Sequence, residues 1–238
     1  WSRIIVQIVY YFFSYFRVMN ENKKINFSVP TGNFGDIYAG YIAKKMGLPI
    51  NKLIIATNKN DILKRVVNTG QYKPLKVEHT LSPSMDIQIA SNFERLVFDI
   101  NSCDSNKTLK YMNDLNEQGE FKLEKNELKK IRESFLSESL SEEETKSVIY
   151  ETYKNQGILI DPHTAIGIGV VKKISLAGNT AILATAHPSK FPDVVTQVTG
   201  IQPELPENLK NILIDKEKYQ KLPTDLKSIQ NYILEKCK

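Results

Sequence analysis

The residues best suited to chemistry form the loop Gly32-Asn33-Phe34-Gly35-Asp36, which stands between an apolar strand-like run and a helix-like run. The first backbone N–H groups of a helix have no helical partners, and the helix dipole places partial positive charge there. Two glycines allow unusual φ values and a close approach of the backbone to a ligand. The sequence therefore predicts a phosphate site in this loop. A tight turn that only closes a strand–helix pair is the alternative.

Three familiar phosphate-binding motifs do not fit this loop. A P-loop needs a lysine after its second glycine, and a dinucleotide fingerprint needs three glycines in the order GxGxxG; neither is present. The GXXG loop of KH domains clamps a nucleotide backbone, where Asp36 would repel the phosphates. The motif alone thus leaves the identity of the anion open.

Composition indicates an ordinary globular protein of one large α/β domain, or one domain with a satellite. The 238 residues carry a net charge of +5, and the lysines are spread along the chain. This balance favours small anionic molecules over nucleic acid as partners. The two cysteines and three histidines have no disulfide-framework or zinc-site spacing, so we expect a cytoplasmic protein without a metal. These residues are Cys103, Cys237, His79, His163 and His187.

The first residues do not resemble a native start. The chain opens at Trp1 without a methionine and runs into the apolar stretch IIVQIVYYFFSYF. This stretch is too short to span a bilayer and lacks the features of a signal peptide. A helix that is apolar around most of its circumference is usually buried in a larger protein. We therefore expect a chain that begins inside a domain, with no membrane partner.

The elements that must position the loop are short aliphatic strands separated by helices. Strand-like runs cover 25–29, 52–58 and 180–186, and helical patterns cover 37–46 and 164–174. Buried parallel strands have this appearance. The order predicts an α/β fold: an open, mostly parallel twisted sheet flanked by helices.

Composition also divides the chain. We expect 1–100 and 157–202 to form the α/β domain, with 101–156 as a helical polar insertion and 203–238 as a helical C-terminal tail. In the insertion, Ser141 with Glu144 fits a capping box that opens a helix. Its acidic residues are interpreted as a solvated face, with a partner-binding patch as the alternative.

Longer stretches carry a resemblance to a known family. These are SVPTGNFGDIYAGYIAKKMGLPINKLIIATNKNDIL, TLSPSMDIQIASNFERL, GILIDPHTAIG and ATAHPSKFP. Together with the opening WSRIIVQIVYY, they resemble threonine synthase, a pyridoxal-phosphate enzyme of fold type II. The resemblance runs in order from Trp1 to about Pro192 and weakens in the polar segment and beyond Pro203.

The resemblance implies pyridoxal 5'-phosphate as cofactor and assigns site residues. The cofactor phosphate would lie on the backbone amides of Gly32, Asn33, Phe34, Gly35 and Asp36, in agreement with the anion site inferred from the loop. The hydroxyl of Thr185 would bond the pyridine nitrogen, where a neutral partner leaves the ring largely unprotonated. Arg3 would grip the phosphate of the substrate, O-phospho-L-homoserine, with its guanidinium fork. The alternatives are a strand threonine bonded to backbone and an arginine on a helix surface.

Several polar residues near these motifs remain ambiguous. His163 and His187 each stand beside a proline and are interpreted as shaping turns near the cofactor, with an acid–base role as the alternative. Asn58, Asn60 and Asp61 follow the carboxyl end of a strand, where open sheets bind ligands, but a structural turn explains them equally well.

One departure from the family concerns the Schiff-base lysine. The family carries it in an upstream Ser-Phe-Lys-Asp type segment, which nothing in these residues matches; Lys122 and Lys190 stand in other contexts. The expectation is therefore the C-terminal part of a threonine synthase, without a catalytic lysine and inactive alone. The missing N-terminal half of the enzyme would be its partner. A threonine-synthase-like lyase for phosphorylated amino acids and a non-catalytic scaffold are the alternatives.

Overall fold

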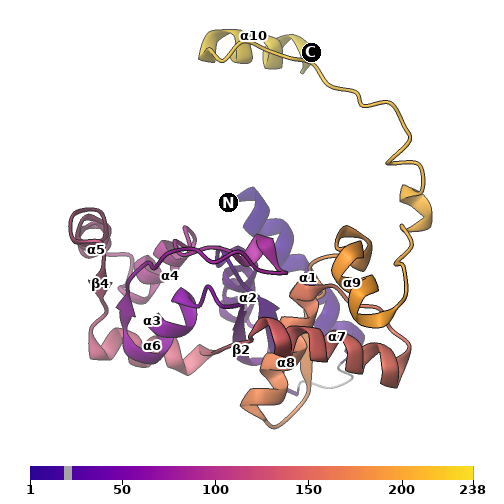
Figure 1. Ribbon diagram of the computed structural model, residues 1–238. Coiled ribbons are helices and arrows are strands. Elements are labelled where there is room, and N and C mark those ends of the chain that lie inside the picture. The colour runs from indigo at the N-terminus through magenta and orange to yellow at the C-terminus, as the bar shows by residue number, and fades with distance from the viewer. Residues whose placement is uncertain (19–22, 238) are drawn as a thin grey trace. The chain divides into compact units, whose positions relative to one another are not determined.

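A computed structural model describes residues 1–18 and 23–237 (Figure 1). The chain separates into two compact units, Trp1–Pro203 and Glu204–Lys238. The first unit contains the sheet and most of the helices. The second contains a single turn of 3-10 helix, Glu207–Leu209, and the helix α10 (Leu226–Lys236), and none of its described residues is buried.

The first unit is built on a four-stranded parallel sheet in the order β5-β2-β1-β6. Its strands are β1 (Ile25–Pro30), β2 (Ile50–Thr57), β5 (Phe135–Ser139) and β6 (Thr180–Ile182). The expected open parallel sheet is thus confirmed. The third expected strand is shorter than the run 180–186, since regular pairing ends at Ile182.

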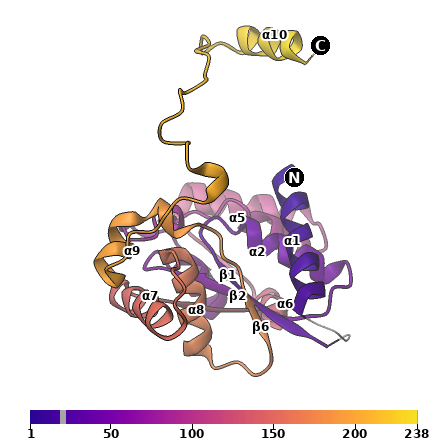
Figure 2. The ribbon, with the colours of Figure 1, turned by 90° about the vertical axis from the view of Figure 1, so that its right-hand side faces the viewer.

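Helices cover both faces of the sheet. Figure 2 shows β1, β2 and β6 between α1 (Ser2–Val18) and α2 (Gly35–Lys45) on one side and α7 (Glu142–Gln156) and α8 (Pro162–Ile174) on the other. The two faces have separate cores because successive side chains of a strand point in opposite directions. Leu53 and Ile55 of β2 belong to the core under α1 and α2, whereas Ile54 and Ala56 belong to the core under α8.

The segment 101–156 is not wholly helical, because it contributes β5 to the main sheet. Phe135 is fully buried, but the strand from Leu136 to Ser139 is only partly buried, and its last three residues are polar. An edge strand pairs on one side only, so its outer groups stay accessible and it needs no apolar run. This explains why the sequence pattern did not reveal it. The expected capping box is present: Ser141 Oγ accepts from Glu144 N at 3.2 Å, and Glu144 Oε2 accepts from Ser141 N at 2.8 Å.

The remaining elements surround the sheet. They are α3 (Ile62–Thr69), α4 (Phe93–Ile100), α5 (Ser105–Gln118), α6 (Lys125–Ser134), α9 (Pro192–Thr199), the antiparallel pair β3 (Gln71–Tyr72) and β4 (Phe121–Lys122), and the 3-10 turns Pro83–Met85 and Pro188–Lys190. None of the helices in the described part of the chain is long and apolar enough to cross a membrane. Within 1–18 and 23–237, no cluster of three or more His, Cys, Asp or Glu side chains could hold a metal ion.

Candidate active site

A cavity of about 870 Å³ opens at the carboxyl ends of β1 and β6. It is lined by the start of α1, the loop 30–36, Ser84, Met85, Ser91, Asn92, Arg95, His163, the segment 183–186 and Lys190. The chain leaves β1 toward β2 on one side, while β6 pairs with β1 on the other side. The cavity therefore lies at the point where the strand order reverses, which is where open α/β sheets bind ligands.

The loop 32–36 presents unpaired backbone donors at this position. The first helical bond of α2 runs from Tyr38 N to Phe34 O at 3.2 Å, so the N–H groups of Gly35, Asp36 and Ile37 precede it. Among the described residues, Gly32 N, Asn33 N and Phe34 N also donate to no backbone or side-chain group. Several N–H groups without acceptors at a helix start form an anion site.

The conformation of the loop depends on Phe34 rather than on the glycines. Phe34 has φ 63° and ψ 7°, in the left-handed region, whereas Gly32 and Gly35 do not have positive φ. The expectation that the glycines supply unusual φ values is therefore wrong. The left-handed conformation is unfavourable for a non-glycine residue. The Phe34 side chain is fully buried and packs edge-on against Phe93, with ring centroids 5.3 Å apart, which holds it in place.

Gly32 serves a different purpose, which is close packing. A Cβ added to it would lie 2.9 Å from Ser84 O and 3.0 Å from Met85 Cα, both main-chain atoms. Only a residue without a side chain lets the 3-10 turn Pro83–Met85 pass at this distance. Asn33 supplies a second tie, because its Oδ1 accepts from Ser91 N at 2.6 Å and from Ser91 Oγ at 2.8 Å. Contacts with the segment 83–92 thus hold the loop in place.

Asp36 brings a carboxyl group to the cavity. Burial raises the pKa of Asp36 to about 6, and its Oδ1 has no hydrogen-bond partner among the described residues. The hydroxyl of Tyr11 donates to the main-chain carbonyl of Asp36 at 2.9 Å, which ties α1 to the start of α2. A protonated Asp36 would remove the repulsion that a carboxylate exerts on a bound phosphate.

The other two predicted site residues also line the cavity. Arg3 lies in the first turn of α1, and Thr185 lies three residues beyond the end of β6. Both are exposed, and neither has a hydrogen bond or ion pair with another described residue. The alternative of a strand threonine bonded to backbone is therefore wrong for Thr185. The structure brings Arg3, the loop 32–36 and Thr185 to one cavity, while their roles there remain predictions.

Two further basic residues line the cavity, and no role for either followed from the sequence. Arg95 at the start of α4 is half-buried; its Nε donates to Asn92 Oδ1 at 3.0 Å, and its guanidinium carbon lies 4.9 Å from the Trp1 ring centroid. Lys190 ends the 3-10 turn after β6 and is exposed. Both residues lie in stretches that resemble threonine synthase, and this resemblance was the only sequence signal that could have pointed to them. Neither has a spacing that would mark it by itself.

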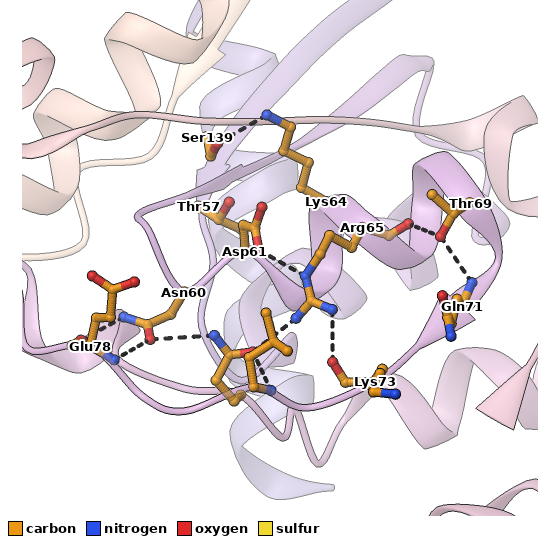
Figure 3. Close-up of polar contacts among 12 residues, drawn as sticks. Thr57, Asn60, Asp61, Lys64, Arg65, Thr69, Gln71, Lys73, Glu78 and Ser139 are labelled. Carbon is orange, nitrogen blue, oxygen red and sulfur yellow. Dashed lines mark hydrogen bonds and ion pairs between the residues drawn. The ribbon is translucent and has the colours of Figure 1, made fainter. Parts of the chain in front are cut away.

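The residues after β2 do not reach the cavity. Asn60 is buried; its Nδ2 donates to Glu78 O at 2.8 Å, and its Oδ1 accepts from Glu78 N at 2.9 Å (Figure 3). Asp61 Oδ1 accepts from Arg65 Nε at 2.9 Å. Asn58 Nδ2 donates to Asp86 Oδ1 at 2.9 Å. These contacts favour the structural interpretation: Asn58 and Asn60 fasten the segment 78–86, and Asp61 pairs with Arg65 at the start of α3.

The two histidines beside prolines differ. His187 is exposed, and its Nδ1 accepts from Ser189 N at 3.2 Å, so it shapes the turn before Lys190 and does not line the cavity. His163 is 3% exposed and does line it. Its Nδ1 lies 2.9 Å from Asp161 Oδ1.

An open parallel sheet with helices on both faces, and an amide loop at its switch point, is the architecture of the pyridoxal-phosphate enzymes of fold type II. A crystal structure of pyridoxal-phosphate-bound threonine synthase from Brucella melitensis superimposes with a TM-score of 0.89 at 43% identity, covering 99% of this chain and 51% of that one. The yeast threonine synthase structure gives a TM-score of 0.84 at 37% identity, covering 100% of this chain and 52% of the yeast chain.

Sequence relatives agree with the structures. The threonine synthase of Pseudomonas aeruginosa is 40% identical over 236 residues, which are 98% of this chain and 50% of that protein. The Saccharomyces cerevisiae enzyme is 40% identical over 264 aligned residues, covering 99% of this chain and 51% of that protein. A family model described as "Threonine synthase, C-terminal" matches residues 164–233. The chain corresponds to the C-terminal portion of threonine synthase and spans about half the length of the curated relatives it matches.

Proposed function

We propose that this chain forms the C-terminal part of a threonine synthase. The complete enzyme converts O-phospho-L-homoserine and water into L-threonine and phosphate with pyridoxal 5'-phosphate as cofactor. The observation that supports this function most directly is the convergence of Arg3, the unpaired amides of the loop 32–36 and Thr185 on one cavity. A cofactor phosphate, a ring nitrogen and a substrate phosphate each find a chemically suitable group there.

The residues of the cavity fit the cofactor. A phosphate needs several convergent donors, and the loop offers N–H groups that have no acceptor within the described residues. The exposed hydroxyl of Thr185 has no described partner, so it is free to bond a ring nitrogen. When bound, pyridoxal phosphate supplies a conjugated ring that stabilises negative charge developing on the substrate.

Each residue has a distinct task in this reaction. The amides of the loop 32–36 hold the cofactor phosphate by hydrogen bonds, at the positive end of the α2 dipole. Thr185 gives the ring nitrogen a neutral partner. Arg3 binds the substrate phosphate and stays charged throughout, so it also stabilises the phosphate as it leaves. Tyr11 and Phe34 keep the loop and α1 in register for these contacts.

We infer that the lysine that holds the cofactor covalently lies outside residues 1–238. Lys190 is the lysine that lines the described cavity, and its sequence context does not match the family motif. Residues 1–238 expressed by themselves should therefore show no stoichiometric attachment of pyridoxal phosphate to a single lysine. Borohydride reduction followed by peptide mass mapping checks this. One fully labelled lysine within the chain would contradict it.

The deciding experiment uses the complete encoded polypeptide, loaded with pyridoxal phosphate and supplied with O-phospho-L-homoserine. A threonine synthase yields L-threonine and phosphate in equal amounts. A threonine-synthase-like lyase releases phosphate without threonine, and a scaffold yields neither. Threonine synthase-like proteins are the more distant relatives, at 33% identity for the human one against 40% for the bacterial and yeast threonine synthases. This difference favours the biosynthetic reaction.

A further inference from the structure

Arg95 is a basic residue of the cavity whose guanidinium group is held in a fixed position. It lies in the first turn of α4 and is half-buried. Its Nε donates to Asn92 Oδ1 at 3.0 Å, and its guanidinium carbon lies 4.9 Å from the ring centroid of Trp1. Asn92 Nδ2 in turn donates to Asn33 O at 3.0 Å, within the loop 32–36. Contacts with a ring and an amide therefore hold the guanidinium group near this loop.

The charge of Arg95 has no partner within residues 1–18 and 23–237. Arg95 forms no ion pair with a described residue, and its two terminal nitrogens donate to none. Asp99 stands four residues further along α4, the spacing at which helical ion pairs form. Both of its oxygens are occupied, since Oδ1 lies 2.5 Å from Lys45 Nζ and Oδ2 accepts from Tyr41 Oη at 2.6 Å. An arginine side chain stays protonated in proteins, so a full positive charge and free donors line the cavity.

The charge of the expected ligands favours a second guanidinium group in this cavity. A phosphate monoester carries a charge of about −1.5 to −2 at neutral pH. The proposed function brings two such groups into the cavity. The loop 32–36 offers its N–H groups to the cofactor phosphate, but Arg3 can balance only one charge of the substrate phosphate. A planar guanidinium fork makes two parallel hydrogen bonds to a phosphate, and both terminal nitrogens of Arg95 are available for them.

We propose that Arg95 binds the phosphate of the substrate, as a second guanidinium group in addition to Arg3. This inference rests on the proposed function, since it places a phosphorylated amino acid in the cavity. Trp1 and Asn92 orient the fork before the substrate binds, so little side-chain entropy is lost on binding. The fork also stays charged as the phosphate leaves, so it stabilises the negative charge of the leaving group.

Two substitutions separate the charge of Arg95 from its packing. Arg95→Gln removes the charge and the fork but keeps a side-chain amide that can donate to Asn92. Arg95→Lys keeps the charge and an apolar stem beside Trp1 but has no fork. Arg17→Gln is the matched control, because Arg17 is exposed, lies 4.8 Å from the ring centroid of Phe13 and does not line the cavity. Urea unfolding of each variant checks that its fold is intact.

The measurement is calorimetric titration of the complete, cofactor-loaded polypeptide with inorganic phosphate and with L-2-aminobutyrate, an amino acid that has no phosphate group. We expect Arg95→Gln to weaken phosphate binding by at least about tenfold, and Arg95→Lys to weaken it less because the charge remains. The affinity for L-2-aminobutyrate should be equal in all variants, and Arg17→Gln should bind phosphate as wild type does. Steady-state kinetics should show the same order of variants in kcat/KM for O-phospho-L-homoserine.

Wild-type phosphate binding by Arg95→Gln would overturn the inference. Weaker binding of pyridoxal phosphate by this variant, with normal phosphate binding once it is loaded, would also overturn it, because Arg95 would then act on the cofactor site. Equal losses for phosphate and L-2-aminobutyrate would mean a general loosening of the cavity and would contradict the inference too. Failure of the proposed function has a different signature. In that case the wild-type polypeptide itself would bind neither pyridoxal phosphate nor O-phospho-L-homoserine, and the role of Arg95 would be rejected with it.

Discussion

Arg3 is the residue for which the functional and the surface interpretations differ most. It is exposed in the first turn of α1 and lines the cavity. Arg3→Lys keeps the charge but loses the planar fork, and a lost charge-assisted hydrogen bond costs about 1.5–3 kcal/mol. We expect kcat/KM of the complete enzyme to fall by roughly ten- to a hundredfold, with weaker inhibition by inorganic phosphate. Steady-state kinetics with phosphate as inhibitor measures both.

Arg17→Lys is the matched control for this prediction. Arg17 lies on the same helix, is exposed, and packs over the Phe13 ring at 4.8 Å from its centroid, away from the cavity. It should behave as wild type. Equal phosphate inhibition in Arg3→Lys and Arg17→Lys would remove Arg3 from the site.

Thr185 tests the contact to the cofactor ring. Thr185→Val removes a hydroxyl that bonds to no other described residue, so the fold should be unaffected. Loss of one neutral hydrogen bond of about 0.5–1.5 kcal/mol should lower turnover by a few- to tenfold. The absorbance spectrum of the bound cofactor should shift as well, because the ring nitrogen loses its partner. Thr224→Val, in the second unit, should leave both unchanged. Wild-type turnover and spectrum in Thr185→Val would assign the hydroxyl no role.

Asp36 predicts a pH dependence of stability in the cofactor-free protein. Its pKa is raised from 3.8 to about 6 by burial, so the folded protein holds a proton that the unfolded chain releases between these values. Stability should therefore fall as pH rises from about 4 to 6. Asp36→Asn should stabilise the protein by about 1–3 kcal/mol at pH 7 and by almost nothing near pH 3. Urea unfolding at the two pH values decides, and a less stable Asn variant at pH 7 would contradict this prediction.

At the scale of elements, the anion loop depends on its contact with the 3-10 turn Pro83–Met85. A Cβ at Gly32 would come within 2.9 Å of Ser84 O, a main-chain atom that cannot simply rotate away. A Cβ at Gly35 would meet only Asn92 Nδ2 at 3.4 Å and side chains at 3.9 Å. Gly32→Ala should therefore destabilise the protein by about 1–3 kcal/mol. Gly35→Ala should change its stability little, since the residue is helical with ordinary φ.

Urea denaturation of the two variants measures this difference. Similar midpoints for Gly32→Ala and Gly35→Ala would show that the turn yields easily and that Gly32 is not required for packing. The comparison concerns stability only, because both glycines also line the cavity.

The sequence predicted those elements of the fold whose stabilising contacts lie between residues close together in the chain. The strands β1 and β2 are buried on both faces, and their aliphatic runs revealed them directly. The capping box of α7 was also readable, because both partners lie within three residues. β5 was not, because an edge strand needs no apolar run. The left-handed Phe34 was missed because the contact that stabilises it, with Phe93, is distant in sequence.

The same distinction holds for the site. The loop 32–36 could be proposed as an anion site from residue types, because glycines directly before a helix are a local sequence pattern. Arg3 lies on α1, Thr185 follows β6, and His163 lies on α8. Only the fold shows that these three residues share a cavity. The family resemblance located Arg3 and Thr185. The pairing of His163 with Asp161 became evident from the distance between them.

At the scale of the whole molecule, the two units differ in how they are held together. The unit Trp1–Pro203 has two buried cores, whereas no described residue of Glu204–Lys238 is buried. Limited trypsin digestion should therefore cut first between Glu207 and Lys221, where every residue is exposed. Lys110 is also exposed but lies within α5, and cleavage there should be slower. Mass spectrometry of the early products gives the order, and an earlier cut at Lys110 would contradict it.

The anchoring of the loop 32–36 has a thermodynamic consequence. Phe34 packs in the core against Phe93, Asn33 bonds to Ser91, and Gly32 lies against the 3-10 turn Pro83–Met85. The backbone N–H groups of the loop therefore point in a fixed direction before any ligand binds. A receptor that is ordered in advance loses little conformational entropy on binding, and more of the contact energy appears as affinity. The conformational free energy of ordering the loop is spent during folding, when Phe34 takes up an unfavourable left-handed conformation. Affinity for the anion and stability of the core are thereby linked through one side chain.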